Sequence, residues 1–313
     1  MISKLPSHIV IREVGLRDGL QSLQTIMPTD AKCAWIRDAH AAGLREIEVG
    51  SFVPPRLLPQ MADTVEVVAY AKTLPGLQVT ALVPNVKGAL RAFEAGVDHI
   101  VLPISASLKH SLANVRRTPL EMMDELRAIL DERRNAGATT RVEAGIGTAF
   151  GCGLQGEVAP DEVIGLMETA LEAGADCVSL ADTIGYADPA RVRSLFERAI
   201  GLAGARFWCG HFHDTRGLAL ANVLAALECG VARFDASLAG IGGCPFAPGA
   251  SGNVATEDLA YMLASMGLPT GIDIEALLRL RGVVASQLPG ESLHGVIARA
   301  GLPRIAPFQA ASH

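Results

Sequence analysis

The 313-residue sequence has no apolar run long enough to cross a membrane and no long run of basic residues. A membrane-spanning helix needs about 18 consecutive apolar residues, and nucleic acids or anionic membrane surfaces attract clustered lysine and arginine. The formal net charge is −6, so we expect neither a membrane nor a nucleic acid as partner. The sequence also lacks the long apolar core and cleavage site of a secretory signal, so we expect a cytoplasmic protein.

Two other signatures are missing. The six cysteines are Cys33, Cys152, Cys177, Cys209, Cys229 and Cys244, and none forms a CxxC pair. In a large cytoplasmic chain such scattered cysteines are buried thiols rather than a disulfide framework. No GxGxxG motif follows the first predicted strand, which weakens the case for a dinucleotide-binding domain.

What the sequence does contain is an alternation of short, largely apolar segments with longer amphipathic ones, repeated about eight times. Short apolar segments are typical of strands buried on both faces of a parallel sheet. We predict strands at 9–14, 46–50, 78–83, 99–103, 140–146, 177–181, 206–211 and 233–237. We predict helices at 29–42, 64–73, 86–95, 120–136, 160–173, 189–202 and 218–229, with two more at 257–266 and 273–284.

A local repeat supports this alternation. The segments AAGLREIEV, EAGVDHIVL, EAGADCVSL and ECGVARFDA each join a helix end, a glycine cap and a strand. Eight repeated βα units favour a closed (β/α)₈ TIM barrel, an α/β fold that takes about 250 residues. We therefore expect a single TIM-barrel domain over 1–313, with the barrel at about 8–250 and extra C-terminal helices at about 251–313.

Two histidines give the strongest local signal for chemistry. His211 and His213 are two residues apart at the predicted end of the seventh strand, so both imidazoles point to the same face. Two imidazoles with a carboxylate form a good seat for a divalent metal. Asp18 could supply that carboxylate, because the first and seventh strands lie near each other in a closed barrel. Two histidines bonded to backbone carbonyls remain the alternative.

Other polar residues fall at the predicted C-terminal strand ends, where TIM-barrel enzymes place their functional residues. Arg17 and Asp18 could act in the site or form a simple ion pair in a turn. Burying a carboxylate inside a barrel costs free energy unless it is paired or bound to a cation. Glu46 and Glu48 could both be such buried carboxylates. Because the two glutamates share the same parity, periodicity does not say which one faces the site.

A glycine-rich loop after the eighth strand carries one thiol. Cys244 sits in AGIGGCP, and such a loop can act as a lid that brings a proton donor to a substrate. An inert cysteine in a glycine loop is the plainer interpretation of this segment alone.

Together, the motifs resemble a known family. The segments EVGLRDGLQ, EIEVGSFVPPRLLPQMADT, LADTIG, HFHDTRGLALAN and AGIGGCPFAPGASGNVATEDL occur in this order. They are similar to 3-hydroxy-3-methylglutaryl-CoA (HMG-CoA) lyases, barrel metallolyases with an Arg-Asp motif on the first strand. The resemblance covers about residues 8–290. It implies an enzyme that cleaves HMG-CoA to acetyl-CoA and acetoacetate in leucine degradation, with an acyl-CoA substrate and a homodimeric state.

The resemblance also implies roles for particular residues. The metal ligands correspond to Asp18, His211, His213 and Asn253, and the metal to Mg²⁺ or Mn²⁺. The other matched positions are Arg17 as the catalytic arginine, Glu48 as the active-site glutamate, Cys244 as the lid thiol, Asp182 and Glu257 as polar residues of the site, and Gln21.

The implied mechanism begins with removal of the proton from the C3 hydroxyl, whose pKa the metal lowers. His211 is our candidate base, and Asp18 is the alternative. The C2–C3 bond then breaks, and the enolate oxygen of acetyl-CoA faces Arg17. Cys244 returns a proton to complete acetyl-CoA.

Four departures from the family pattern bear on the substrate. The first motif has Leu16, Ser22 and Leu23, the fourth loop has Leu108 in place of a glutamate, Ala181 replaces a glycine beside Asp182, and Thr148 replaces a cysteine. None of these changes removes a predicted ligand or catalytic residue. Ala181 and Leu108 could narrow the pocket, so a lyase for a related 3-hydroxyacyl-CoA such as citramalyl-CoA, which releases pyruvate, stays open.

Three further alternatives remain. A Claisen-condensing acyltransferase of the isopropylmalate synthase type shares the HxH barrel but normally carries additional domains. An aldolase for free oxo acids would ignore CoA, and a non-enzymatic binding barrel would not need the predicted site residues. Four residues after the fourth strand could meet CoA phosphates or form a solvated basic turn: Lys109, Asn114, Arg116 and Arg117.

Overall fold

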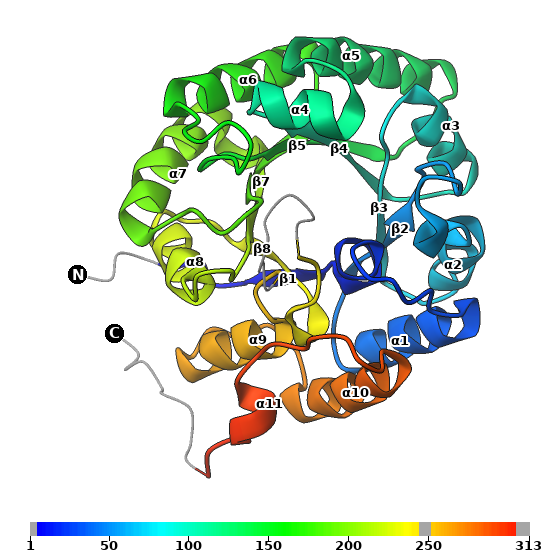
Figure 1. The fold of residues 1–313 in the computed structure, drawn as a ribbon, viewed down its shortest axis with the longest axis vertical. Coiled ribbons are helices and arrows are strands. Elements are labelled where there is room, and N and C mark those ends of the chain that lie inside the picture. The colour runs from blue at the N-terminus through cyan, green and yellow to red at the C-terminus, as the bar shows by residue number, and fades with distance from the viewer. Residues whose placement is uncertain (1–4, 244–251, 305–313) are drawn as a thin grey trace.

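Eight parallel strands close into a barrel in the computed structural model, which describes residues 5–243 and 252–304 (Figure 1). The strands follow one another around the barrel in chain order, from β1 to β8, and β8 pairs with β1. They are β1 (Val10–Glu13), β2 (Glu46–Ser51), β3 (Gln78–Leu82), β4 (His99–Ser105), β5 (Arg141–Gly147), β6 (Cys177–Asp182), β7 (Phe207–Phe212) and β8 (Arg233–Ala236). The predicted TIM barrel is confirmed.

The helices surround the barrel as the amphipathic segments predicted. They are α1 (Thr29–Ala41), α2 (Thr64–Ala71), α3 (Val86–Glu94), α5 (Pro119–Asn135), α6 (Pro160–Ala173), α7 (Pro189–Ala203), α8 (Ala219–Glu228), α9 (Thr256–Ser265) and α10 (Ile274–Gln287). Two helices were not predicted, namely α4 (Leu108–Val115) and α11 (Ile297–Ala300). No helix in the described part of the chain is long and apolar enough to cross a membrane.

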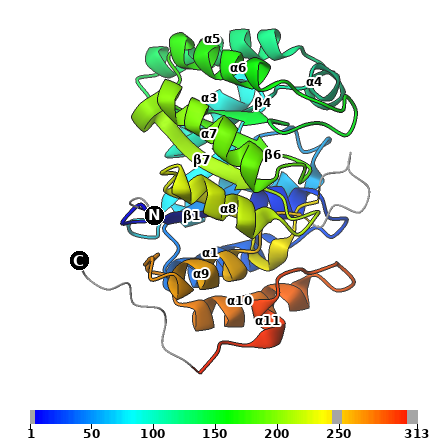
Figure 2. The same ribbon diagram turned by 90° about the vertical axis from the view of Figure 1, so that its left-hand side faces the viewer.

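The helix after β8 belongs to the ring. Helix α9 packs against β1 and α10, and Figure 1 places it between α8 and α1. Helix α10 lies outside this ring against α1 and α9, as the side view also indicates (Figure 2). Helix α11 packs on α9. We therefore propose that the barrel ends after α9 rather than near residue 250, and that the extension begins with α10.

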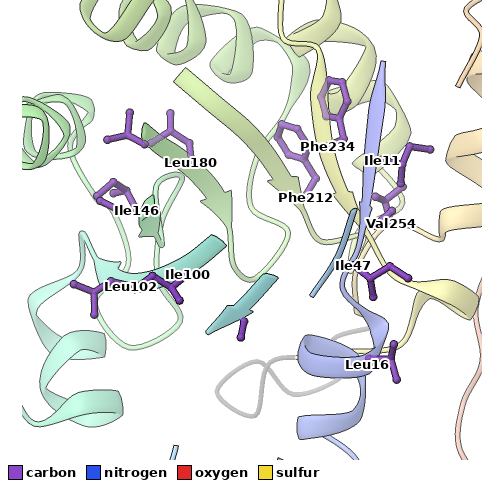
Figure 3. Packing of buried hydrophobic residues seen from close by; sticks show 14 of the residues in the cluster. Ile11, Leu16, Ile47, Ile100, Leu102, Ile146, Leu180, Phe212, Phe234 and Val254 are labelled. Atoms are coloured by element: carbon purple, nitrogen blue, oxygen red, sulfur yellow. The ribbon is translucent and has the colours of Figure 1, made fainter. Parts of the chain in front are cut away.

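The apolar core lies between the strands and the helices rather than in the middle of the barrel. Arg12 on β1 bonds with Glu143 on β5, and strands four places apart in a closed ring can meet only through its interior. Alternation along each strand then turns the neighbouring side chains outward. Ile11, Phe212 and Phe234 are such side chains, and all are buried in the apolar layer (Figure 3). Polar residues are thus left to fill the barrel itself.

Glycine fixes the turns that bring each helix back to its next strand. Helix α6 ends at Gly174 with a φ of 99°, in the left-handed region that favours glycine. Gly43 after α1 has a φ of 103°, and a Cβ there would lie 2.1 Å from the Gly271 carbonyl oxygen. The repeated glycine caps seen in the sequence therefore allow each of these helices to end and the chain to turn into the next strand.

Candidate active site

Three of the predicted metal ligands meet at the C-terminal end of the barrel. Asp18 lies in a short π-helical turn, η1 (Gly15–Gly19), just after β1, while His211 lies next to the last residue of β7 and His213 follows the strand. The Asp18 Oδ2 atom is 3.6 Å from His213 Nε2 and 3.9 Å from His211 Nε2. The two Nε2 atoms are 3.1 Å apart. These three side chains form a group that could hold a metal ion.

The fourth predicted ligand lies beside them. Asn253 forms a β-bridge with His213, and its Nδ2 donates to Asp18 Oδ2 at 2.7 Å. Its Oδ1 is buried and accepts no hydrogen bond among the described residues. Its Nδ2 also donates to the Ile241 carbonyl oxygen at 3.2 Å, so the amide oxygen would reach a cation beside Asp18 only if the amide turned and gave up these two hydrogen bonds. The donor set of two imidazoles, one carboxylate and one amide oxygen fits a divalent cation.

Asp18 is held as a carboxylate. Its Oδ1 accepts hydrogen bonds from Arg17 Nη1 at 2.6 Å and from Gln21 Nε2 at 2.8 Å. Burial alone would raise the pKa of Asp18, but the Arg17 charge and the two imidazoles lower it well below its usual value. Arg17 and Asp18 therefore form the ion pair that was one interpretation of the sequence. This pair also orients the Asp18 carboxylate toward the histidines.

The structure distinguishes the two glutamates of β2. Arg17 Nη2 lies 2.7 Å from Glu48 Oε2, and the Glu48 side chain is 1% exposed. Burial raises the pKa of Glu48, and Arg17 offsets part of that rise. Glu46 instead pairs with Arg233 at the start of β8, toward the opposite end of the barrel. Glu48 is thus the glutamate that belongs to the candidate site.

Two other predicted residues support loops around the site. Asp182 accepts hydrogen bonds from the backbone of Tyr186 and Ala187, which shapes the loop after β6. Burial raises the pKa of Asp182. Glu257 accepts from the Ala239 backbone and pairs with Arg281, so neither carboxylate bonds directly to the histidines. Cys244 lies outside the described residues.

The residues suggested for CoA phosphates or a solvated basic turn lie partly on a helix that was not predicted and partly in the bend that follows it. Lys109, Asn114, Arg116 and Arg117 are all exposed on α4 or the segment that follows it. Arg117 pairs with Glu125 of α5. The N-cap is Ser107, whose hydroxyl accepts from the His110 backbone; this serine was the signal that could have predicted the helix.

Sequence reasoning missed a polar layer beneath the site. His211 Nδ1 lies 3.0 Å from Asp235 Oδ2 on β8, and Asp235 is bound by Arg12 of β1. Arg12 also binds Glu143 of β5, which contacts His99 of β4. The argument applied to Glu48 could have found these residues, because each is an ionisable side chain within a predicted buried strand.

The chain resembles known proteins over most of its length. The HMGL-like family model matches residues 8–284. A hydroxymethylglutaryl-CoA lyase from Bacillus subtilis is 40% identical over 273 residues, which is 87% of this chain and 91% of the relative. A 3-hydroxy-3-isohexenylglutaryl-CoA/hydroxy-methylglutaryl-CoA lyase from Pseudomonas aeruginosa is 40% identical over 274 residues, or 88% of this chain and 91% of the relative.

A solved structure agrees in fold over nearly the whole chain. It is an HMG-CoA lyase from Acinetobacter baumannii in complex with coenzyme A and 3-methylmalate, with a TM-score of 0.90 and 40% sequence identity. The match covers 97% of this chain and 98% of that one. The resemblance inferred from the five motifs is confirmed: this chain belongs to the HMGL-like family.

Proposed function

We propose that this protein is a lyase that cleaves HMG-CoA to acetyl-CoA and acetoacetate. The observation that carries the proposal is the convergence of Asp18, His211, His213 and Asn253 at the functional end of a TIM barrel. Relatives about 40% identical over most of the chain are named as lyases for this substrate, and one structural relative is in complex with coenzyme A.

We propose Mg²⁺ or Mn²⁺ as the cofactor, held by those four side chains. The set contains oxygen and imidazole donors and no thiolate, which suits these cations better than soft metals. When bound, the cation would polarise the substrate's oxygens and lower the pKa of the C3 hydroxyl.

His211 was predicted both as a ligand and as the base, and these two roles compete for one atom. Its Nδ1 is already engaged by Asp235, so only Nε2 can bind a cation or accept the hydroxyl proton. His211→Gln separates the roles, because the glutamine amide oxygen can reach toward the Nε2 position but accepts no proton. Retained Mn²⁺ binding with a loss of about 10²–10⁴ in kcat would assign the base to His211.

Cleavage of the C2–C3 bond leaves its electron pair on the thioester as an enolate, while C3 becomes the ketone of acetoacetate. Arg17 lies between the Asp18 and Glu48 carboxylates, where its guanidinium can face the enolate oxygen. Protonation of the enolate at C2 gives acetyl-CoA. Cys244 remains our predicted proton donor for this step.

A citramalyl-CoA lyase is the second candidate, and the position of Ala181 favours it. Ala181 on β6 pairs in register with His211 on β7, so its methyl group lies on the strand beside the candidate site. Leu108 is exposed at the start of α4. Both departures could change the space for the distal carboxylate of the substrate.

A coupled assay with Mg²⁺ tests both candidates. The purified protein is offered HMG-CoA and each citramalyl-CoA enantiomer, and acetoacetate and pyruvate are followed. Acetoacetate from HMG-CoA, lost in His211→Ala, is the expected result; pyruvate alone would move the function to citramalyl-CoA. Release of free CoA from acetyl-CoA with an oxo acid, detected with a thiol reagent, would instead favour the condensing enzyme.

A further inference from the structure

The polar layer inside the barrel connects the candidate site to its interior. From His211 it runs through Asp235 and Arg12 to Glu143 and His99, and these five residues come from five different strands. Ser179 and Cys209 donate further hydrogen bonds to its two carboxylates. Apart from His211, the layer uses residues to which the proposed reaction gives no role.

Among the other residues of this layer, only Asp235 bonds to a predicted ligand, His211. Its Oδ2 lies 3.0 Å from His211 Nδ1, on the opposite side of the imidazole from Nε2, which lies 3.1 Å from His213 Nε2. A carboxylate accepts hydrogen bonds and donates none. The Nδ1 atom must therefore carry a proton, and in the neutral ring this leaves the Nε2 lone pair directed toward Asp18 and His213.

Arg12 fixes Asp235 in this state. Its Nε donates to Asp235 Oδ1 at 2.6 Å, and its Nη2 donates to Oδ2 at 3.0 Å. Arg12 is 4% exposed, so these two hydrogen bonds form away from water, where bidentate pairing of a guanidinium with a carboxylate is strongest. Glu143 binds the other edge of the same guanidinium at 2.8 Å and thereby limits how far Arg12 can turn.

We propose that Asp235, oriented by Arg12, is the positioning residue for His211, because it keeps the proton on Nδ1 and directs Nε2 toward Asp18 and His213. The inference rests on the proposed role of His211 as a ligand in the lyase reaction. It assigns Asp235 no contact with substrate.

Asp235→Asn is the informative variant, because an amide cannot satisfy all of its neighbours. Arg12 donates at both oxygen positions, and the shorter contact is at Oδ1. The amide oxygen should take that position, so the amide NH₂ faces His211 Nδ1. His211 must then accept at Nδ1 and carry its proton on Nε2, the wrong tautomer for binding a cation.

The first measurement is the tautomer of His211 in protein selectively labelled with ¹⁵N-histidine, free of metal. We expect a protonated Nδ1 and an unprotonated Nε2 in the wild type, and the reverse in Asp235→Asn. A wild-type protein with its proton on Nε2 would overturn the proposal, even if the variant fails to fold. A variant that folds and keeps the wild-type tautomer would overturn it as well.

The second measurement is the affinity for Mn²⁺ alone, by titration calorimetry without substrate. Asp235→Asn should weaken binding by about 10- to 100-fold, as loss of a ligand's hydrogen-bond partner typically does. Glu143→Gln is the matched control, since it neutralises the second carboxylate that Arg12 binds and makes no change at a group that contacts His211. Equal weakening in both variants, or in neither, would contradict the proposal. Because neither readout uses HMG-CoA, failure of the proposed reaction would leave these results intact.

Discussion

The barrel contains two clusters of similar composition that behave differently. Asp18, His211 and His213 meet at its C-terminal end, while His99, Glu143 and Cys177 meet inside it, and each set brings its ligand atoms within 4.8 Å. The inner cluster is fully buried, whereas the side chains of Asp18 and His211 are each 12% exposed. Composition alone would therefore suggest two metal sites.

Charge balance separates the two clusters. In the inner one, Arg12 and His99 both bond to Glu143, and burial with Glu143 nearby raises the pKa of Cys177, so its thiol stays protonated. Arg12 thus already supplies the cation. In the outer cluster two imidazole nitrogens face each other and the Asn253 oxygen has no donor among the described residues. Arg17 pairs with Asp18 only at Oδ1, so Oδ2 and the two facing imidazole nitrogens leave ligand atoms that a metal could share.

The largest effect should come from the outer cluster. His211→Ala removes a predicted ligand, so we expect loss of Mn²⁺ binding and a fall in turnover of HMG-CoA of about 10²–10⁴-fold. Calorimetry and steady-state kinetics check the two outcomes. His99→Ala is the control from the inner cluster and should leave Mn²⁺ affinity unchanged. Equal loss in both variants would erase the distinction between the clusters.

The inner cluster should instead govern stability. Arg12→Met leaves Asp235 and Glu143 buried without their cation, which should cost about 3–5 kcal/mol in the free energy of unfolding. Urea unfolding measures this change. Arg37→Met breaks the exposed pair with Asp38, in which the arginine is 58% exposed, and should cost at most about 1 kcal/mol. Similar costs for the two variants would refute the structural role given to Arg12.

Arg17 contacts both Asp18 of the outer cluster and Glu48. Replacing Arg17 therefore tests how an arginine at the candidate site differs from Arg12, which lies beneath the site. Arg17→Met should lower kcat by about 10²–10³-fold through lost stabilisation of the enolate. Arg17→Lys keeps the charge but loses the planar fork that reaches both carboxylates, and should recover only part of the rate. Unchanged kcat in Arg17→Met would remove the arginine from the mechanism.

Glu13 offers a third case, a buried carboxylate with no ion pair among the described residues. It accepts hydrogen bonds from the backbone of Gly15 and Leu238 and from the Thr256 hydroxyl. Burial raises the pKa of Glu13 from 4.5 to about 7. The folded protein therefore binds a proton that the unfolded chain has already released between these values, so stability falls as pH rises from about 4.5 to 7.

Glu13→Gln should remove this dependence, because its amide can donate to the Thr256 hydroxyl while its oxygen accepts the two backbone bonds. Relative to the wild type, the free energy of unfolding of the variant should rise by up to about 3 kcal/mol across that window. Denaturant titrations at a series of pH values provide the comparison. A difference in the free energy of unfolding that stays constant at all pH values would show that folding does not raise the pKa of Glu13.

Much of the fold could be predicted from local pattern. All eight strands and nine of the helices were predicted, because strand and helix periods and glycine caps are encoded within a few residues. Helix α4 was missed because it has only eight residues and follows its strand almost directly, where a loop was expected. The motifs also predicted Asp18, His211, His213 and Asn253 as site residues, and the structure places these four side chains together.

The sequence by itself determined the barrel, the family and the identity of the residues at the strand ends, since each depends on order along the chain. Only the tertiary structure decided that Glu48 rather than Glu46 meets Arg17, and that Arg12 joins Asp235 to Glu143, residues 223 and 131 positions away. The physical reason is that alternation tells which face of a strand a side chain occupies. It does not tell how high the side chain sits in the barrel, or which charge stands opposite it across the interior.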